Sequence, residues 1–94
     1  MMEYPLAHFA DGRYRVEMMV MPRGEYHLEV IEEGQVLALV LLRGQISVQP
    51  QGRARPRRLV ATPAMPVFLV TPGSYHVVAD THCVGIRGVR HDAR

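Results

Sequence analysis

The side chains best placed to do chemistry are His27 and Glu29, which stand two residues apart in a run of alternating residues. Successive side chains of a β-strand point to opposite faces, so this spacing would put an imidazole and a carboxylate on one face. The two groups could bind a ligand together, or could be hydrogen-bonded polar residues in or near a cavity. His27 and Glu29 are therefore the first candidate site residues.

The other reactive residue types give weaker signals. Cys83 is the single cysteine, and we interpret it as a small buried hydrophobe, not a reactive thiol, because no paired cysteine accompanies it. His8 and His91 lie near the termini and receive no role. Neither a Ser/His/Asp triad, nor a phosphate-binding Gly-rich loop, nor a zinc Cys motif can be assembled from these residues and spacings.

Length and composition indicate one globular domain. With 94 residues, 48% hydrophobic and 21% charged, the chain can build one core, which we expect to span about residues 13–90 of a single domain, 1–94. No apolar run approaches the roughly 20 residues that a membrane helix needs, and the first residues do not resemble a signal peptide. The lone cysteine also suits a reducing compartment, so we expect a cytoplasmic protein.

All the basic residues are arginines, and the net charge is +2. The one dense basic run holds Arg53, Arg55, Arg57 and Arg58. It could contact phosphate, but it has no aromatic neighbours for base stacking and no helix to enter a groove. We therefore predict a solvated hairpin loop, and neither nucleic acid nor membrane as a partner.

The elements that must position these side chains are short strands. Gly, Pro and Asp turn signals recur about every ten residues, which is typical of a β-sandwich or barrel. Little or no helix is expected. The predicted strands cover residues 6–10, 14–21, 25–32, 35–42, 45–49, 57–62, 67–71, 75–80 and 82–89.

Alternation predicts what each strand face carries. In the strand that holds His27 and Glu29, one face is apolar, with Tyr26, Leu28 and Val30, and the other is mixed. In residues 35–42 both faces are apolar, so one should face the core and the other should be covered by a second sheet or subunit. A homodimer that packs through residues 35–42 is the preferred explanation. Met18, Met19 and Met21 could line an adaptable pocket, although filling gaps in the core is the commoner use of methionine.

Two segments together resemble the cupin superfamily. Residues 40–48, with Gly44 at the turn, are similar to the end of the first cupin motif, and residues 72–78, with a Pro-Gly turn before His76, are similar to the second. The resemblance covers roughly residues 20–90 and implies an all-β fold: a single-domain jelly-roll barrel, or double-stranded β-helix, of short antiparallel strands. Among small cupins, the spacings look most like the tellurite-resistance-associated group.

The resemblance also implies a metal site, from which this sequence departs. Counted back from Gly44, the family's glutamate position falls on Leu37, and its two histidine positions fall on Val30 or Ile31 and on Glu32 or Glu33. Only His76 matches a ligand position. If the hairpin loop is shifted, His27, Glu29 and His76 could form a two-histidine, one-carboxylate set for Fe, Mn, Ni or Zn, with His82 as a further nitrogen or simply a turn residue. The absence of a metal is favoured.

Three functions follow from these residues. The leading one is binding of a small molecule in the barrel, near His27, Glu29, Tyr75 and His76. The second is a metal-dependent oxygenase or isomerase that uses His27, Glu29 and His76. The third is a dimerising structural module that acts through residues 35–42. Whether the protein is an enzyme is left open at this point.

Overall fold

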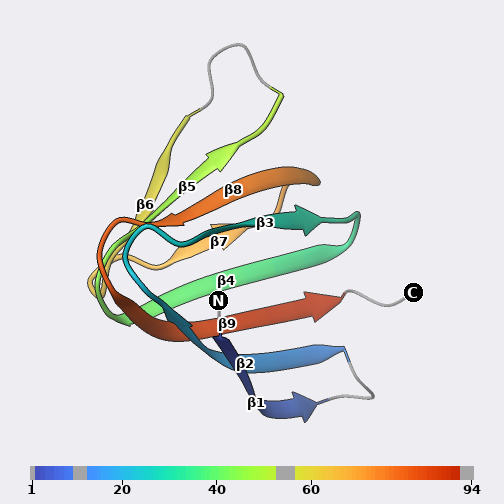
Figure 1. Ribbon diagram of the computed structural model, residues 1–94. Helices are drawn as coiled ribbons and strands as arrows, with labels where there is room; N and C mark the ends of the chain where they lie inside the picture. Colours follow the sequence, from blue (N-terminus) through green and yellow to red (C-terminus); the bar gives the residue numbers. More distant parts are fainter. Residues whose placement is uncertain (1, 10–12, 53–56, 92–94) are drawn as a thin grey trace.

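The computed structural model describes residues 2–9, 13–52 and 57–91, with the backbone alone for residues 2–9. These residues form short strands joined by turns (Figure 1). The strands are β1 (Met2–Phe9), β2 (Tyr14–Met21), β3 (Tyr26–Ile31), β4 (Gln35–Arg43), β5 (Ile46–Pro50), β6 (Leu59–Ala61), β7 (Val67–Leu69), β8 (Gly73–Ala79) and β9 (Cys83–His91).

The strands make two antiparallel sheets that face each other. One sheet has the order β1-β2-β9-β4-β7, and the other has the order β3-β8-β5-β6. The chain crosses between the sheets at every connection except β1–β2 and β5–β6, so most neighbours in a sheet are not neighbours in sequence. Two sheets joined by such crossovers form a jelly roll. The β4–β5 and β8–β9 turns lie at one end of the barrel, and the β3–β4 turn lies at the other, which we call the mouth (Figure 1).

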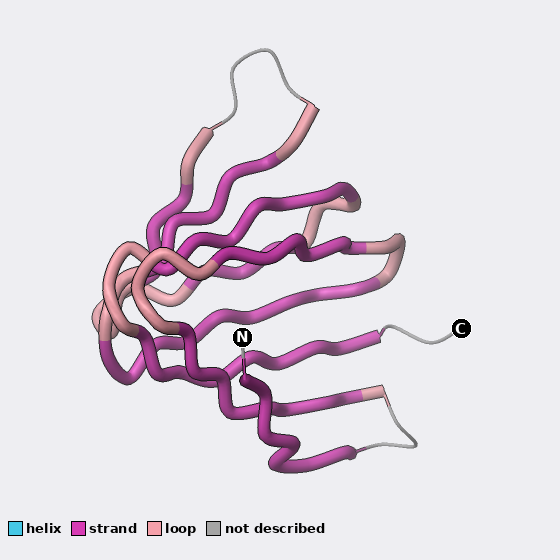
Figure 2. Tube along the Cα trace, viewed as in Figure 1, coloured by secondary structure: helices cyan, strands magenta, loops and turns pink. Residues whose placement is uncertain are grey.

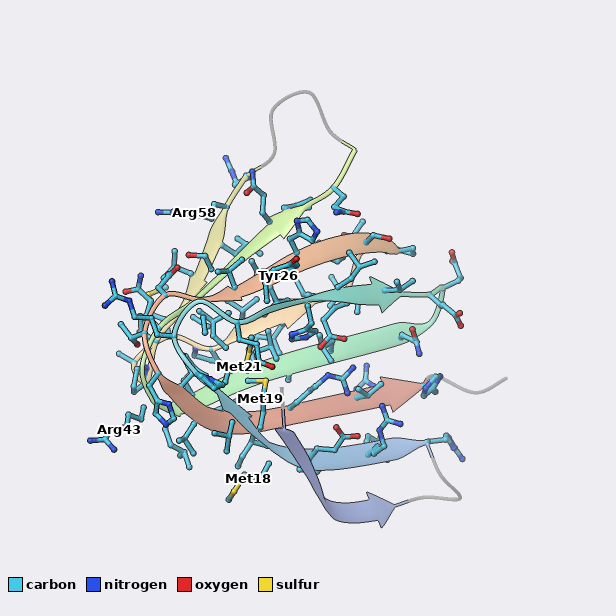
Figure 3. All side chains as sticks on the ribbon, viewed as in Figure 1. Met18, Met19, Met21, Tyr26, Arg43 and Arg58 are labelled. Carbon is cyan, nitrogen blue, oxygen red and sulfur yellow. The ribbon has the colours of Figure 1, made fainter. Side chains whose placement is uncertain are left out.

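The core fills the space between the sheets. Alternate side chains of each strand point inward and are apolar along most of their length. Figure 3 shows all the described side chains, and Met19 and Met21 are fully buried among those of the core, whereas Met18 lies on the outer face. The methionines of β2 that face inward therefore fill the core. The largest fully buried side chains are Met19, Met21, Leu37, Leu39, Ile46, Val48, Val77 and Cys83.

The prediction of an all-β chain is confirmed. Figure 2 shows strands and loops and no helix over the described residues. In particular, none of those residues belongs to a helix long and apolar enough to cross a membrane. Each predicted strand has a counterpart, although β6 and β7 are shorter than expected and β9 extends to His91. Of the basic run, Arg53 and Arg55 lie outside the described residues, while Arg57 and Arg58 precede β6 and are exposed.

The two faces of β3 have an unusual orientation. The mixed face, with His27, Glu29 and Ile31, points into the barrel, and the apolar face points to solvent. On β4 the inward leucines are buried, while Leu42 on the outer side is 61% exposed. The barrel therefore holds a few charged groups beside its apolar core and carries several exposed apolar groups outside.

Candidate functional site

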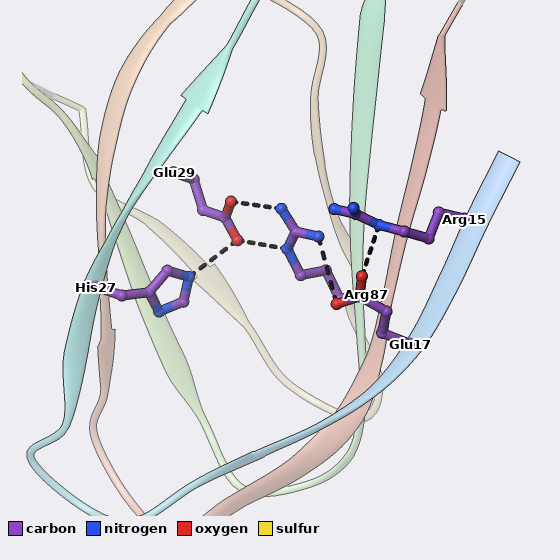
Figure 4. A network of polar contacts seen from close by, with 5 residues as sticks. All are labelled: Arg15, Glu17, His27, Glu29 and Arg87. Atoms are coloured by element: carbon purple, nitrogen blue, oxygen red, sulfur yellow. Dashed lines mark hydrogen bonds and ion pairs between the residues drawn. The ribbon is translucent and has the colours of Figure 1, made fainter. Parts of the chain in front are cut away.

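A chain of charged and polar side chains crosses the interior of the barrel from β2 through β9 to β3 (Figure 4). Arg15 Nε lies 2.6 Å from Glu17 Oε1, and Glu17 Oε2 lies 3.7 Å from Arg87 Nη1. Arg87 then donates two hydrogen bonds of 2.7 Å to Glu29, one from Nε and one from Nη2. His27 Nε2 completes the chain at 2.9 Å from Glu29 Oε2.

The two strand registers explain how these groups meet. Glu17 is directly opposite Arg87 in the β2–β9 ladder, so the two side chains emerge on the same inner face. His27 and Glu29 share the inner face of β3 in the facing sheet, and the Arg87 guanidinium reaches across to Glu29. A bidentate guanidinium–carboxylate pair fixes both side chains in orientation as well as in position.

Glu29 is ionised throughout the ordinary pH range. Burial opposes its charge, but the hydrogen bonds from Arg87 and His27 and their positive charges outweigh burial, and they lower the pKa of Glu29 from 4.5 to about 2. The carboxylate is thus a fixed negative charge between two cationic or hydrogen-bonding partners.

Glu17 Oε2 and His27 Nδ1 are among the buried atoms of this network that have no hydrogen-bond partner within the described residues. Buried polar atoms are nearly always paired with protein, water or ligand, because an unmade hydrogen bond costs about 1–3 kcal/mol. The interior of the barrel therefore has hydrogen-bonding capacity that the described residues of the protein do not use.

A cavity of about 190 Å³ opens at the mouth of the barrel, next to this chain of side chains. Its polar side chains are those of Arg15, Gln35, Arg87 and His91, and all of them can donate N–H groups. Gln35 and His91 contact each other across the β4–β9 ladder, with Gln35 Nε2 3.1 Å from His91 Nε2. The cavity wall is therefore rich in donors, while the acceptors Glu17 and Glu29 are held against the guanidinium groups.

Tyr75, a predicted site residue, lies on the inner face of β8 directly opposite Glu29. It is buried, and its hydroxyl donates a 2.6 Å hydrogen bond to the carbonyl of Thr71. The ring therefore forms part of the interior wall beside Glu29, and its polar end is already satisfied by the backbone.

His76 does not join the other predicted site residues, contrary to the expectation from the sequence. The β3–β8 register places Tyr75 inside, so His76 points outward, where it is exposed. There its Nε2 lies 2.8 Å from Gln51 Nε2, and its ring stacks edge to face on Tyr26. The structure brings together His27, Glu29 and Tyr75, and it puts His76 on the opposite side of the sheet.

The residues present do not fit a divalent metal. The two-histidine, one-carboxylate set of His27, Glu29 and His76 does not assemble, and Glu29 is already held by both arms of Arg87. Ile31 and Leu37, at positions that correspond to ligands by resemblance, are buried aliphatic groups. Over the described residues, no group of three or more His, Cys, Asp or Glu side chains could hold a metal ion.

Similarity to known proteins is visible in the fold and not in the sequence. No protein-family model matches the chain, and no curated protein is detectably similar to it. The Cupin_2 domain of an XRE-family transcriptional regulator from Enterobacter cloacae, however, superposes with a TM-score of 0.77 at 14% identity, covering 99% of this chain and 97% of that domain. The chain has the cupin fold.

Two further cupin-fold structures are similar. A cupin superfamily protein from Desulfitobacterium hafniense has a TM-score of 0.73 at 12% identity, with 96% of this chain and 75% of that one covered. Ectoine synthase from P. lautus has a TM-score of 0.74 at 16% identity, and 95% of this chain covers 62% of the synthase. The cupin barrel thus occurs in proteins of different function, and the resemblance to the tellurite-resistance-associated group stays a prediction.

Three members of the interior network of charges were not predicted from the sequence: Arg15, Glu17 and Arg87. Each is a charged residue that shares its strand face with inward-pointing apolar residues, such as Met19 in β2 and Val89 in β9. A charge on the core face of a strand is rarely left unpaired, so these positions could have been identified as mutual partners. The signal was that each charged residue lies an even number of positions from an inward-pointing apolar residue of its own strand. No short motif contains this relation.

His82 and Cys83 lie at the end of the barrel opposite the mouth. His82 is an exposed turn residue between β8 and β9, and it belongs to no group of three or more described His, Cys, Asp or Glu side chains that could hold a metal ion. Cys83 is fully buried, and its Sγ lies 3.2 Å from the carbonyl oxygen of Gln45 and 3.1 Å from that of Thr81.

We expect the Cys83 thiol of the folded protein to react slowly with iodoacetamide. Burial raises the pKa of Cys83, against the smaller opposing effect of its hydrogen bonds, so both access and thiolate content are low. Mass spectrometry of the native protein at pH 8 should show at least a ~100-fold slower alkylation than of the urea-unfolded chain. Comparable rates in the two states would contradict this burial.

Proposed function

We propose that this cupin binds a small, acceptor-rich molecule, such as a short carboxylate, at the mouth of its barrel. The observation that carries the proposal is the cavity of about 190 Å³ whose polar side chains, Arg15, Gln35, Arg87 and His91, are all N–H donors. Arginine forks match carboxylate and phosphate oxygens, and a small polar-lined concavity on a rigid barrel is a common kind of ligand site.

The arrangement of the interior supports a preformed site. Arg87 is held by Glu29 and lies beside Glu17, so its guanidinium faces the mouth without having to be ordered when a ligand arrives. Val89 and Leu37 provide apolar wall around the polar groups. The site predicted from the sequence, near His27, Glu29 and Tyr75, thus adjoins this cavity through Glu29 and Arg87.

Binding is favoured over metal-dependent catalysis for this barrel. The oxygenase or isomerase hypothesis needed His27, Glu29 and His76 around one ion, and His76 lies on the outer face. Ectoine synthase and the domain of a transcriptional regulator share the fold, so the fold itself is compatible with either role.

Isothermal titration calorimetry with succinate and with inorganic phosphate, at matched ionic strength, tests the proposal. We expect saturable binding of at least one anion, and a roughly tenfold weaker affinity in Arg15→Gln, which removes one charge-assisted donor worth about 1.5 kcal/mol. Arg15 is half-exposed, so its loss should leave the fold intact.

Arg43→Gln is the matched control, since Arg43 is exposed at the far end of β4 from the cavity (Figure 3). Its affinity for the anion should equal that of the wild type. Absence of heat with both anions, or equal weakening in Arg15→Gln and Arg43→Gln, would show that the cavity is not an anion site.

A further inference from the structure

The outer face of the five-stranded sheet carries apolar side chains in three rows across the strands. Alternation and register place on this face the side chains that point away from the buried leucines of β4 and methionines of β2. Among the described residues, no acidic side chain lies on it. The rows are Val16, Gly88, Ala38 and Phe68; then Met18, Ile86 and Val40; then Val20 and Val84, with Leu42 at the β4 bulge beside them. A further row, nearer the mouth, holds Tyr14, Arg90 and Val36 and so brings one cation to this face.

This face has a hollow on one side and a projection on the other. The hollow, of about 210 Å³, lies where Ala38 and Gly88 stand next to each other in the β4–β9 ladder, and Phe68 and Tyr14 flank it. The projection is Leu42, which is 61% exposed. The central row of Ile86 and Val40 separates the two features.

We propose that this face binds the same face of a second copy of the chain, with Leu42 of each copy seated in the hollow over Ala38 and Gly88 of the other. A two-fold axis that lies in the interface and crosses the strands at the level of Val40 and Ile86 would bring this about. Rotation about this axis places the row that ends in Leu42 of one copy over the row of Gly88 and Ala38 of the other, and the reverse, because each row lies about 7 Å from the axis. The two contacts between Leu42 and the hollow therefore form together. An isologous interface requires this kind of self-complementarity.

The size of the face suits a dimer. Four strands of eight or nine residues and the three-residue β7, about 4.8 Å apart and rising about 3.3 Å per residue, give a plan of roughly 600 Å². The accessible area of such a corrugated surface is larger than its plan and thus near the roughly 800 Å² per partner of a standard interface. Among the described residues the face carries no negative charge that would select a basic partner, and Arg90 lines the hollow. Because the relief of the face complements itself, a second copy is the occupant that it fits.

The outer face of the other sheet is a less suitable surface. It also exposes apolar residues, among them Leu28 and Val30 of β3, but β3 is an edge strand and the neighbouring strands β8 and β5 place the polar side chains of His76 and Gln49 beside them. That face therefore provides a control of similar exposure in the same molecule.

Sedimentation equilibrium of the wild-type chain and two variants tests the dimer. We expect the wild type to be dimeric at micromolar concentration and Val40→Glu to weaken association at least 100-fold, because it buries a charge at the centre of the interface. Gly88→Leu should weaken it at least tenfold although it adds apolar surface, because the new side chain fills the hollow. An added Cβ at Gly88 meets nothing within 4 Å in the single chain, so this variant should fold.

Val30→Glu, on the outer face of the other sheet, is the matched control and should dimerise like the wild type. Circular dichroism and thermal unfolding check that each variant is folded. A wild-type monomer at 100-fold higher concentration, a dimer lost in Val30→Glu but kept in Val40→Glu, or a Gly88→Leu dimer as tight as the wild type would each overturn the proposal. Because these measurements need no ligand, they are independent of the anion titrations.

Discussion

Replacing Arg87 by methionine should lower the free energy of unfolding at pH 7 by about 3–5 kcal/mol, the usual result of removing one partner of a buried ion pair. Arg87 is the central member of the chain of interior side chains, with two hydrogen bonds to Glu29 and Glu17 close by. Without it, two buried carboxylates remain in the barrel, Glu17 beside Arg15 and Glu29 beside His27, and neither has the Arg87 guanidinium as a counter-charge. Urea denaturation followed by circular dichroism measures the loss.

The pH dependence identifies the cause. In the wild type the pKa of Glu29 is about 2 in the folded protein against 4.5 ordinarily, so its ionised form stabilises the fold above pH 4.5. This contribution, about 3 kcal/mol, is lost as the pH falls from about 4.5 to about 2. In Arg87→Met burial would instead raise the pKa of Glu29, and the fold would gain stability as Glu29 takes up a proton. The difference between wild type and variant should therefore shrink as the pH is lowered from 6 to 3.

Two further variants separate the ion pair from simple loss of packing. Arg43→Met removes an exposed arginine at the end of β4 and should change stability by less than about 0.5 kcal/mol. The double variant Arg87→Met/Glu29→Met should recover at least half of the loss, since exchanging both members of a buried pair for apolar groups removes the unpaired charge. A deficit that is the same at pH 6 and pH 3, and that the double variant does not reduce, would contradict this account.

Much of the fold could be predicted from the sequence because turns and alternation are local properties. The turn residues recur at the spacing of short strands, and the resemblance through Gly44 and residues 72–78 pointed to the jelly roll that the structure has. The double apolar character of β4 was also correctly anticipated, with Leu39 buried and Val40 on the outer face. None of this required knowledge of which strands are neighbours.

The site was harder to predict because it depends on contacts between distant strands. His27 and Glu29 were found, since both lie on one strand two residues apart. Arg87 is 58 residues from Glu29, and only the crossover between the sheets brings them together. His76 was assigned to the site by its resemblance to a motif position, but in this chain the register after Gly73 turns Tyr75 inward and His76 outward. A shift of one residue in a strand exchanges its faces, and the sequence alone does not determine that shift.

Gly44, the turn residue that carried the resemblance, should tolerate no side chain. Its φ is 93°, in the region that residues other than glycine rarely adopt. A Cβ there would collide with the backbone carbonyl of His82 and would lie 2.8 Å from Cys83 Sγ and 2.9 Å from Thr81 Oγ1. This crowding arises where the β4–β5 and β8–β9 turns pack together, so neither turn can move without opening the end of the core that Cys83 closes. Gly44→Ala should therefore cost about 3–5 kcal/mol, the sum of backbone strain and overpacking.

Gly24→Ala isolates the two contributions to that loss. Gly24 has a φ of 84°, similar to that of Gly44, but nothing lies within 4 Å of a Cβ added there. This variant should lose only the roughly 1–2 kcal/mol of backbone strain, and urea denaturation of both variants gives the difference directly. If the two alanine variants were equally destabilised, the contact between the turns would contribute nothing. If Gly44→Ala is the more unstable by 2 kcal/mol or more, close packing of the two turns is what requires glycine at this position.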